Sequence, residues 1–137
     1  MALTVEISTA EGAVFEFDAE YVAVPTEMGE IGIMAGHVPL AAVVQPGLLR
    51  LRSGENWESI AIDRGFLLLQ KDFLAIAVDA AVNVVDLDAE EAANAKKRAE
   101  EALEEAKKSR LDGEEIAQLE AKIRYQTIKQ LAKKSQP

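Results

Sequence analysis

Glycine and proline divide this chain of 137 residues into two parts that follow different patterns. Seven of the eight glycines and three of the four prolines lie at or before Gly65, and residues 66–112 contain neither. These residue types mark turns between short elements, whereas a long run without them permits extended helices. We therefore expect an α+β chain in two separate parts, a turn-rich domain over residues 1–87 and a helical appendage over residues 88–137.

The first part predicts an antiparallel β-sandwich. Short apolar segments with period-two alternation recur roughly every 8 to 12 residues between turn-forming residues, which is typical of an antiparallel sandwich or barrel. Six of the seven aromatic residues lie here, as a packed sheet core requires. The predicted strands cover residues 3–7, 13–17, 21–24, 48–52, 57–62, 66–69 and 73–78.

The second part predicts two helices folded into an antiparallel hairpin. Beyond Leu87 the composition changes to alanine, glutamate, lysine and arginine, which are strong helix formers. Asp88 and Asp112 are each followed by glutamate three residues later, so we expect them to cap helices that begin near residues 89 and 113. The first helix has a narrow stripe of small residues and the second a bulkier stripe. Because an alanine stripe buries little apolar area, we expect a marginally stable hairpin that can detach or repack on a partner. The two predicted stripes contain Ala92, Ala95, Ala99, Ala102, Leu103 and Ala106, then Ile116, Leu119, Ile123, Ile128 and Leu131.

The composition excludes most kinds of catalytic centre. The chain has no cysteine and one histidine, His37, so thiol catalysis, disulfides and thiolate metal sites are excluded. A hydrolase with a histidine base would have to use His37, and a zinc site would need carboxylates for nearly all its ligands. We therefore expect no catalytic residue, no metal and no cofactor.

A cluster of glycines invites comparison with phosphate-binding loops. Gly29, Gly32 and Gly36 fit neither GxGxxG nor GxxxxGK[ST], and Pro39 prevents a regular helix where a phosphate would need one. We interpret the three glycines as tight turns between strands.

The sequence predicts neither a targeting segment nor a membrane span. No basic region precedes an apolar run at the N-terminus, so we expect a cytosolic chain. Residues 31–49 carry no formal charge, but Pro39 and Pro46 would remove backbone hydrogen bonds that hydrocarbon cannot replace. We expect a buried strand-and-turn region there.

The net charge of −9 is unevenly distributed. Residues 1–87 hold 13 acidic and 4 basic side chains, whereas residues 88–137 hold 11 of each. This balance disfavours nucleic acid and anionic lipid as partners. After Glu120, however, the chain has basic residues and no acidic one, which suits an acidic protein partner. The basic residues are Lys122, Arg124, Lys129, Lys133 and Lys134.

Three segments, residues 29–52, 64–81 and 87–103, resemble the epsilon subunit of bacterial and plastid F-type ATP synthases. The most specific part is GEIGIMAGHVPL followed by PGLLR, and the resemblance covers essentially the whole chain. It implies a non-catalytic central-stalk (rotor) subunit of the proton-translocating enzyme. The sandwich would bind the gamma subunit and the ring of membrane c subunits, and the hairpin would inhibit ATP hydrolysis when it extends towards the alpha and beta subunits.

The resemblance also implies a location and roles for single residues. The loop at Glu30 would face the c ring, His37 would lie near gamma, and an extended terminal helix would bring Lys129, Lys133 and Lys134 to an acidic loop of the beta subunit. The protein would lie on the cytoplasmic face of the bacterial inner membrane, held there through the complex, with the plastid thylakoid as the less favoured location.

Some members of the family bind ATP through an (I/L)-D-x-x-R-A motif. Here Leu87 and Asp88 are followed by Glu91 where the motif has arginine, and an anion in place of a cation disfavours phosphate binding. Arg98 is the candidate for another contact of that site. We expect no ATP binding and interpret Asp88 as a helix cap.

Two other functions stay open at this point. One is a stand-alone sandwich scaffold or adaptor with a helical interaction tail. The other is a small enzyme that uses His37.

Overall fold

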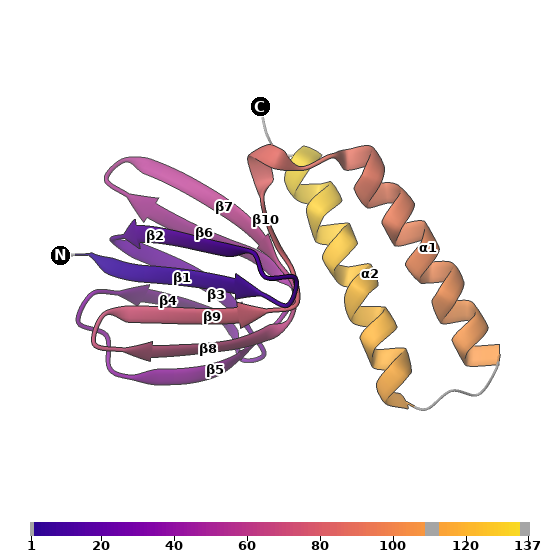
Figure 1. Cartoon of the computed structure of the whole chain (residues 1–137), viewed down its shortest axis with the longest axis horizontal. Coiled ribbons are helices and arrows are strands. Elements are labelled where there is room, and N and C mark those ends of the chain that lie inside the picture. The colour runs from indigo at the N-terminus through magenta and orange to yellow at the C-terminus, as the bar shows by residue number, and fades with distance from the viewer. Residues whose placement is uncertain (1, 109–112, 135–137) are drawn as a thin grey trace.

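A computed structural model describes residues 2–108 and 113–134, and over these residues the chain forms a β-sandwich followed by a helical hairpin (Figure 1). A 3-10 turn, η1 (Val84–Asp86), joins the two parts, and the hairpin consists of α1 (Ala89–Lys108) and α2 (Gly113–Lys134). The strands among the described residues are β1 (Leu3–Thr9), β2 (Val14–Ala19), β3 (Tyr21–Thr26), β4 (Gly29–Met34), β5 (Leu40–Val44), β6 (Gly47–Ser53), β7 (Asn56–Ile62), β8 (Gly65–Gln70), β9 (Phe73–Val78) and β10 (Ala81–Asn83).

The strands follow the order β10-β7-β6-β3-β5-β8-β9-β1-β2, and β4 pairs with β3 outside this path. The predicted sandwich is confirmed, and the strand pairs are antiparallel with one exception, because β1 runs parallel to β9. The sequence from β2 to β8 separates these two strands, so no tight hairpin turn forces them to run in opposite directions.

Three strands, β4, β5 and β10, are additional to the predicted set. The turn interpretation of the glycines is right for Gly36, whose φ is +86°, but wrong for Gly32, which lies inside β4. A Cβ atom at Gly32 would lie 2.7 Å from the hydroxyl oxygen of Tyr21 on the paired strand. This glycine therefore gives room for the close approach of a ring rather than forming a turn.

The sandwich has a hydrophobic core of its own. Alternate residues of β1, namely Leu3, Val5 and Ile7, are fully buried, and every buried member of the main core cluster lies between Leu3 and Val78. The region of residues 31–49 forms β4, β5 and the start of β6. Among the described residues no helix is both long and apolar enough to cross a membrane.

The helices begin where the sequence predicts. Asp88 caps α1, since its Oδ1 accepts hydrogen bonds from the backbone N–H groups of Glu90 at 2.9 Å and Glu91 at 3.2 Å. Asp112, the second predicted cap, lies outside the described residues. The domain boundary between residues 87 and 88 stays a prediction.

Helix α2 lies between the sandwich and α1 (Figure 1), and it contacts β6, β7 and η1. Its side chains that are buried are Ala121, Tyr125 and Ala132. The predicted apolar stripes are only partly right, because Leu131 is 62% exposed and Ala102 is also exposed. A second, small hydrophobic cluster joins hairpin and sandwich through Val84, Leu87 and Ala132, with Leu48 and Val82 packed against it.

Candidate interaction surfaces and the hairpin cleft

The outer face of β5, β8 and β9 is apolar and open to solvent. Phe66, Leu68 and Phe73 are 67%, 48% and 42% exposed. Strand register places Phe66 between Val43 and Ala77, and Leu68 between Ala41 and Ala75, all on one side of the sheet. Exposed apolar surface of this kind is a candidate interaction site. We call it the apolar face and define it by Ala41, Val43, Phe66, Leu68, Phe73, Ala75 and Ala77.

The sequence analysis does not identify this face, although β8 carries a signal for it. The segment FLLL is apolar at every position, whereas a half-exposed strand alternates with polar residues. In the structure Leu67 and Leu69 point into the core with 2% and 0% exposure, while Phe66 and Leu68 point outward.

His37 lies in the loop between β4 and β5, next to the Phe73 end of the apolar face. The backbone N–H of Gly36 donates to Oδ1 of Asp72 in the β8–β9 turn at 2.7 Å. The half-buried imidazole places Nδ1 2.7 Å from the carbonyl oxygen of Val38, a backbone group rather than the carboxylate that orients a catalytic histidine. His37 thus lies beside the Phe73 end of the apolar face, and its role at an interface stays a prediction.

Glu30 lies near the other end of β4. Its Oε1 forms an ion pair with Nη2 of Arg50 at 3.0 Å, and both side chains are about half exposed. The Arg50 guanidinium lies 6.0 Å from the ring centroid of Trp57, which meets Tyr21 edge to face at 6.1 Å. Because β4 spans roughly 20 Å, Glu30 and His37 lie near its opposite ends.

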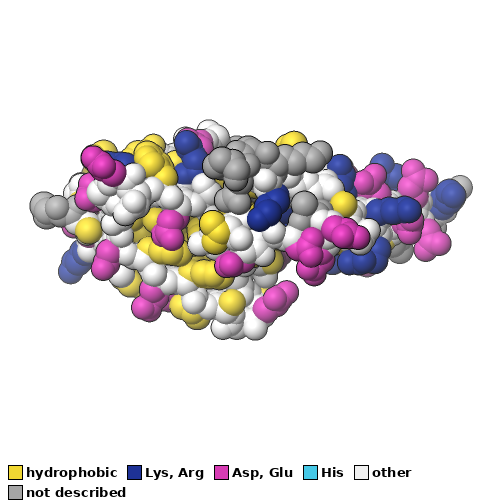
Figure 2. Space-filling model, turned by 90° about the horizontal axis from the view of Figure 1, so that it is seen from above, with side chains coloured by type: hydrophobic (Ala, Val, Ile, Leu, Met, Phe, Trp, Pro, Cys, Tyr) yellow, Lys and Arg dark blue, Asp and Glu magenta, His cyan; other side chains and the backbone are white. Residues whose placement is uncertain are grey.

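Charge is distributed over these surfaces as the sequence predicts. Figure 2 shows hydrophobic side chains among acidic ones over the sandwich, and side chains of both signs over the far end of the hairpin. The three ion pairs found among the described residues, including Arg52–Glu20 at 3.2 Å, are all at least partly exposed. Each therefore contributes at most about 1 kcal/mol to stability.

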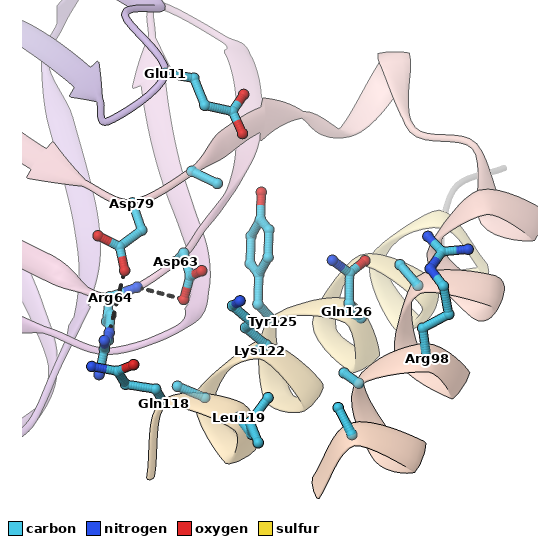
Figure 3. A pocket seen from close by; sticks show the side chains of 15 residues that line it. Glu11, Asp63, Arg64, Asp79, Arg98, Gln118, Leu119, Lys122, Tyr125 and Gln126 are labelled. Carbon is cyan, nitrogen blue, oxygen red and sulfur yellow. Dashed lines mark hydrogen bonds and ion pairs between the residues drawn. The ribbon is translucent and has the colours of Figure 1, made fainter. Parts of the chain in front are cut away.

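Between hairpin and sandwich lies a cleft of about 630 Å³ (Figure 3). The sandwich contributes Asp63, Arg64 and Asp79, and the Arg64 guanidinium pairs with Asp79 at 3.2 Å. From α2, Tyr125 is 5% exposed and its hydroxyl donates to the carbonyl oxygen of Ala61 at 3.4 Å. The cleft is thus lined by charged and polar groups from both parts.

The side chains in this contact have altered pKa values. Burial raises the pKa of Asp63, and Asp79 adds to this effect, while the Arg64 N–H and the charges of Arg64 and Lys122 oppose it. Burial also raises the pKa of Tyr125, and the negative charges of Asp63 and Glu11 raise it further. Because these shifts arise mainly from desolvation, the contact buries groups that water solvates well.

The three lysines predicted to contact a beta subunit lie near the end of α2. Lys129 is half-buried, its Nζ lies 4.9 Å from the ring centroid of Tyr125, and burial lowers its pKa. Lys133 is partly buried, and the side chain of Lys134 lies outside the described part. Their contact with a partner stays a prediction, and in the present arrangement Lys129 faces the hairpin contact.

Asp88 and Arg98, the two candidates for nucleotide binding, do not form one site. Arg98 lines the cleft, whereas Asp88 does not line it and caps α1 about 15 Å away along the helix axis. Among residues 2–108 and 113–134 no group of three or more Asp, Glu or His side chains is arranged to hold a metal ion.

Comparison with known proteins identifies the class to which this architecture belongs. The family model for the ATP synthase Delta/Epsilon chain, beta-sandwich domain, matches residues 2–84. The ATP synthase epsilon chain of Bordetella avium is 37% identical over 131 residues, which cover 95% of this chain and 90% of that protein. The epsilon chain of Halalkalibacterium halodurans is 38% identical over 110 residues, covering 80% and 83%.

Two solved structures share the fold. A chain of the Euglena gracilis mitochondrial ATP synthase, in a structure of OSCP, F1 and the c ring, has a TM-score of 0.70 at 22% identity and covers 96% of this chain and 81% of its own length. A chain from the central stalk and c ring of the Tetrahymena thermophila enzyme has a TM-score of 0.51 at 15% identity, covering 63% and 69%. The present chain belongs to the family of ATP synthase epsilon chains. Members of this family are non-catalytic subunits, so the chain is not itself an enzyme.

Proposed function

We propose that the chain is the central-stalk epsilon subunit of a proton-translocating F-type ATP synthase, which couples gamma to the c ring and restrains ATP hydrolysis through its hairpin. The observation that carries this proposal is that the sandwich has its own core and the hairpin does not share it. The sandwich has a core of its own and an open apolar face, whereas the hairpin contacts it through one small cluster and the buried side chains of Ala121 and Tyr125, with a cleft beside them. Such a chain can stay bound through its sandwich while its hairpin moves.

The apolar face is the surface proposed to bind gamma. Phe66, Leu68 and Phe73 offer large apolar side chains that a partner would remove from water. His37 lies at the rim of this face, which supports its proposed place near gamma. Glu30, with Arg50, is proposed to face the c ring on the surface of β4 and β6.

The hairpin is proposed to exchange between the docked arrangement and an extended one that reaches the alpha and beta subunits. Undocking would release Lys129 from the ring of Tyr125 and expose the basic end of α2. An acidic loop of beta would then attract Lys129, Lys133 and Lys134.

The protein is proposed to lie at the cytoplasmic face of a bacterial inner membrane, attached through the complex. The relatives from Bordetella avium and Halalkalibacterium halodurans support a bacterial rather than a plastid enzyme.

Co-purification with gamma tests the proposal. The full-length chain, co-expressed with the gamma subunit of the same organism, should elute with it at a one-to-one ratio. Leu68→Glu should abolish this association, because it places a charge in the centre of the apolar face. Leu131→Glu changes a leucine on α2 that is more exposed, at 62% against 48% for Leu68, and should leave the association intact. A wild-type chain that does not bind gamma would overturn the rotor assignment.

A further inference from the structure

Asp63 is an acidic residue in a buried position beside the hairpin. It follows the last residue of β7, and only 7% of it is exposed. Its Oδ1 accepts a hydrogen bond from the backbone N–H of Arg64 at 2.8 Å, and its own N–H donates to the carbonyl oxygen of Ala80 at 2.9 Å. None of the ion pairs among the described residues includes Asp63, because the Arg64 guanidinium pairs with Asp79 instead.

Helix α2 covers this carboxyl group. Figure 3 shows Asp63 directed into the cleft towards Tyr125 and Lys122 of α2. Tyr125 is anchored just beside it, since its hydroxyl donates to Ala61, two residues before Asp63. If α2 leaves the sandwich, Tyr125 and Lys122 leave with it and Asp63 regains contact with water.

The other charged and titratable groups around the cleft come from every element packed there. The sandwich places Arg64 and Asp79 beside Asp63, and Glu11 at the β1–β2 turn. Helix α2 contributes Lys122, Tyr125 and Lys129, and α1 contributes Arg98 on the far side of Gln126. The negative charge of Glu91 on α1 raises the pKa of Lys129, against the larger effect of burial.

We propose that Asp63 is a proton-sensitive latch for the hairpin, in which the carboxyl group takes up a proton as α2 docks and releases it as α2 leaves. This inference deepens the proposed function, because it rests on the exchange between docked and undocked hairpins. It concerns the docking equilibrium itself, however, and not the inhibition of ATP hydrolysis.

The direction of the pH dependence follows from linkage between protonation and docking. The pKa of Asp63 is raised in the docked arrangement by burial, whereas the exposed carboxyl of an undocked chain titrates near its ordinary value of about 3.9. A proton bound to Asp63 therefore favours docking. The stabilisation is complete below the undocked pKa and is lost as pH rises through the raised docked pKa.

Tyr125 and Lys129 act in a different pH range. Because the pKa of Tyr125 is raised in the docked arrangement, the neutral phenol favours docking. This stabilisation is complete below the ordinary pKa near 10 and is lost as the phenol ionises. The lowered pKa of Lys129 has the reverse sign, because the ammonium form opposes docking. The ordinary pKa values of both groups lie near 10, far above that of a carboxyl group.

Spin-label distances measure the docked fraction directly. The chain has no native cysteine, so Glu55→Cys and Glu101→Cys, both at exposed positions, can carry one nitroxide each on sandwich and α1. As pH falls from about 8 to about 4.5, the docked-to-undocked ratio should rise, by up to roughly tenfold for each unit by which docking raises the pKa of Asp63.

Two variants separate Asp63 from a general effect of charge. Asp63→Asn keeps an Oδ1 acceptor for the Arg64 N–H but cannot ionise, so it should raise the docked fraction at about pH 8 and remove the acid-side dependence. Asp18→Asn makes the same change at an exposed site on β2 and should keep the wild-type profile. A wild-type docked fraction that ignores pH, or an Asp63→Asn profile that matches wild type, would overturn the latch.

A reciprocal measurement keeps the test decisive if Asp63→Asn does not fold. The carboxyl carbon of Asp63, followed by NMR, should titrate at a lower pH in Tyr125→Ala than in wild type, because loss of the ring undocks α2. An unchanged pKa would mean that α2 does not cause the burial, and the latch would be wrong. If docking follows pH but ATP hydrolysis by the complex ignores the hairpin, the latch stands and the regulatory function falls.

Discussion

At the scale of single residues, the hairpin contact includes side chains that are costly to bury. Besides Asp63, the amide of Gln126 lies between Tyr125 and α1, and its Oε1 is a buried side-chain atom for which the described residues provide no hydrogen-bond partner. An unsatisfied buried acceptor costs about 1–3 kcal/mol. The proposed detachment of the hairpin would recover this cost.

Replacing Gln126 should therefore stabilise the docked hairpin. Gln126→Leu removes the unpaired oxygen and fills similar space, so we expect docking to strengthen by about 1 kcal/mol. Slower amide hydrogen exchange in α2 would report this change. Gln130→Leu, on the same helix but outside the lining of the cleft, is the control and should leave exchange nearly unchanged. Faster exchange in Gln126→Leu would show that the amide stabilises the hairpin.

At the scale of elements, the sequence predicts those whose signals are local. The spacing of Asp88 and Glu91 places the start of α1 correctly, because a cap is formed by residues that are neighbours in the chain. Strand β4 could not be predicted this way, since Gly32 makes room for the ring of Tyr21 on the paired strand, which is not a neighbour in the sequence. The apolar face likewise depends on strand register, which brings Phe66 and Ala77 side by side.

The positions of the predicted interaction residues also depend on the fold. Glu30 and His37 are predicted from the resemblance, and the structure places them near opposite ends of β4. The sequence has no signal for Asp63, because its burial depends on contact with a helix some 60 residues further along the chain.

Glycine substitutions test how tightly β8 and β9 are packed. A Cβ atom at Gly65 would collide with the backbone of Ala77 and Val78 on β9, so Gly65→Ala should lower the free energy of unfolding of the sandwich by about 3 kcal/mol or more. Gly113→Ala is the matched control. A Cβ atom added at Gly113 meets open space at the start of α2, so the substitution should stabilise the helix by up to about 1 kcal/mol. Urea unfolding measures both, and a stable Gly65→Ala chain would contradict the packing described.

At the scale of the whole molecule, charge is divided unevenly between the two parts. The sandwich region carries the entire net charge of −9, and the hairpin region is neutral with a basic end. The docked arrangement keeps Lys129 against Tyr125. Extension would therefore present to a partner a basic surface that docking partly covers.

Neutralising that surface should weaken inhibition in the assembled complex. With Lys129, Lys133 and Lys134 all changed to Gln, we expect ATP hydrolysis to rise and its salt dependence to fall, because exposed charges attract an acidic partner less at high ionic strength. Changing Lys96, Lys97 and Lys107 of α1 to Gln removes the same charge elsewhere and should have a smaller effect. Equal effects of the two triple variants would contradict a specific contact.

The central claim is that the sandwich holds the chain in the complex while the hairpin regulates it. ATP hydrolysis by the assembled complex, compared with and without residues 88–137, tests this claim most directly. The shortened chain keeps the residues of the main core, so it should still be present at one copy per gamma subunit. The account predicts faster hydrolysis at that unchanged stoichiometry. An unchanged rate, with the shortened chain in place, would contradict it.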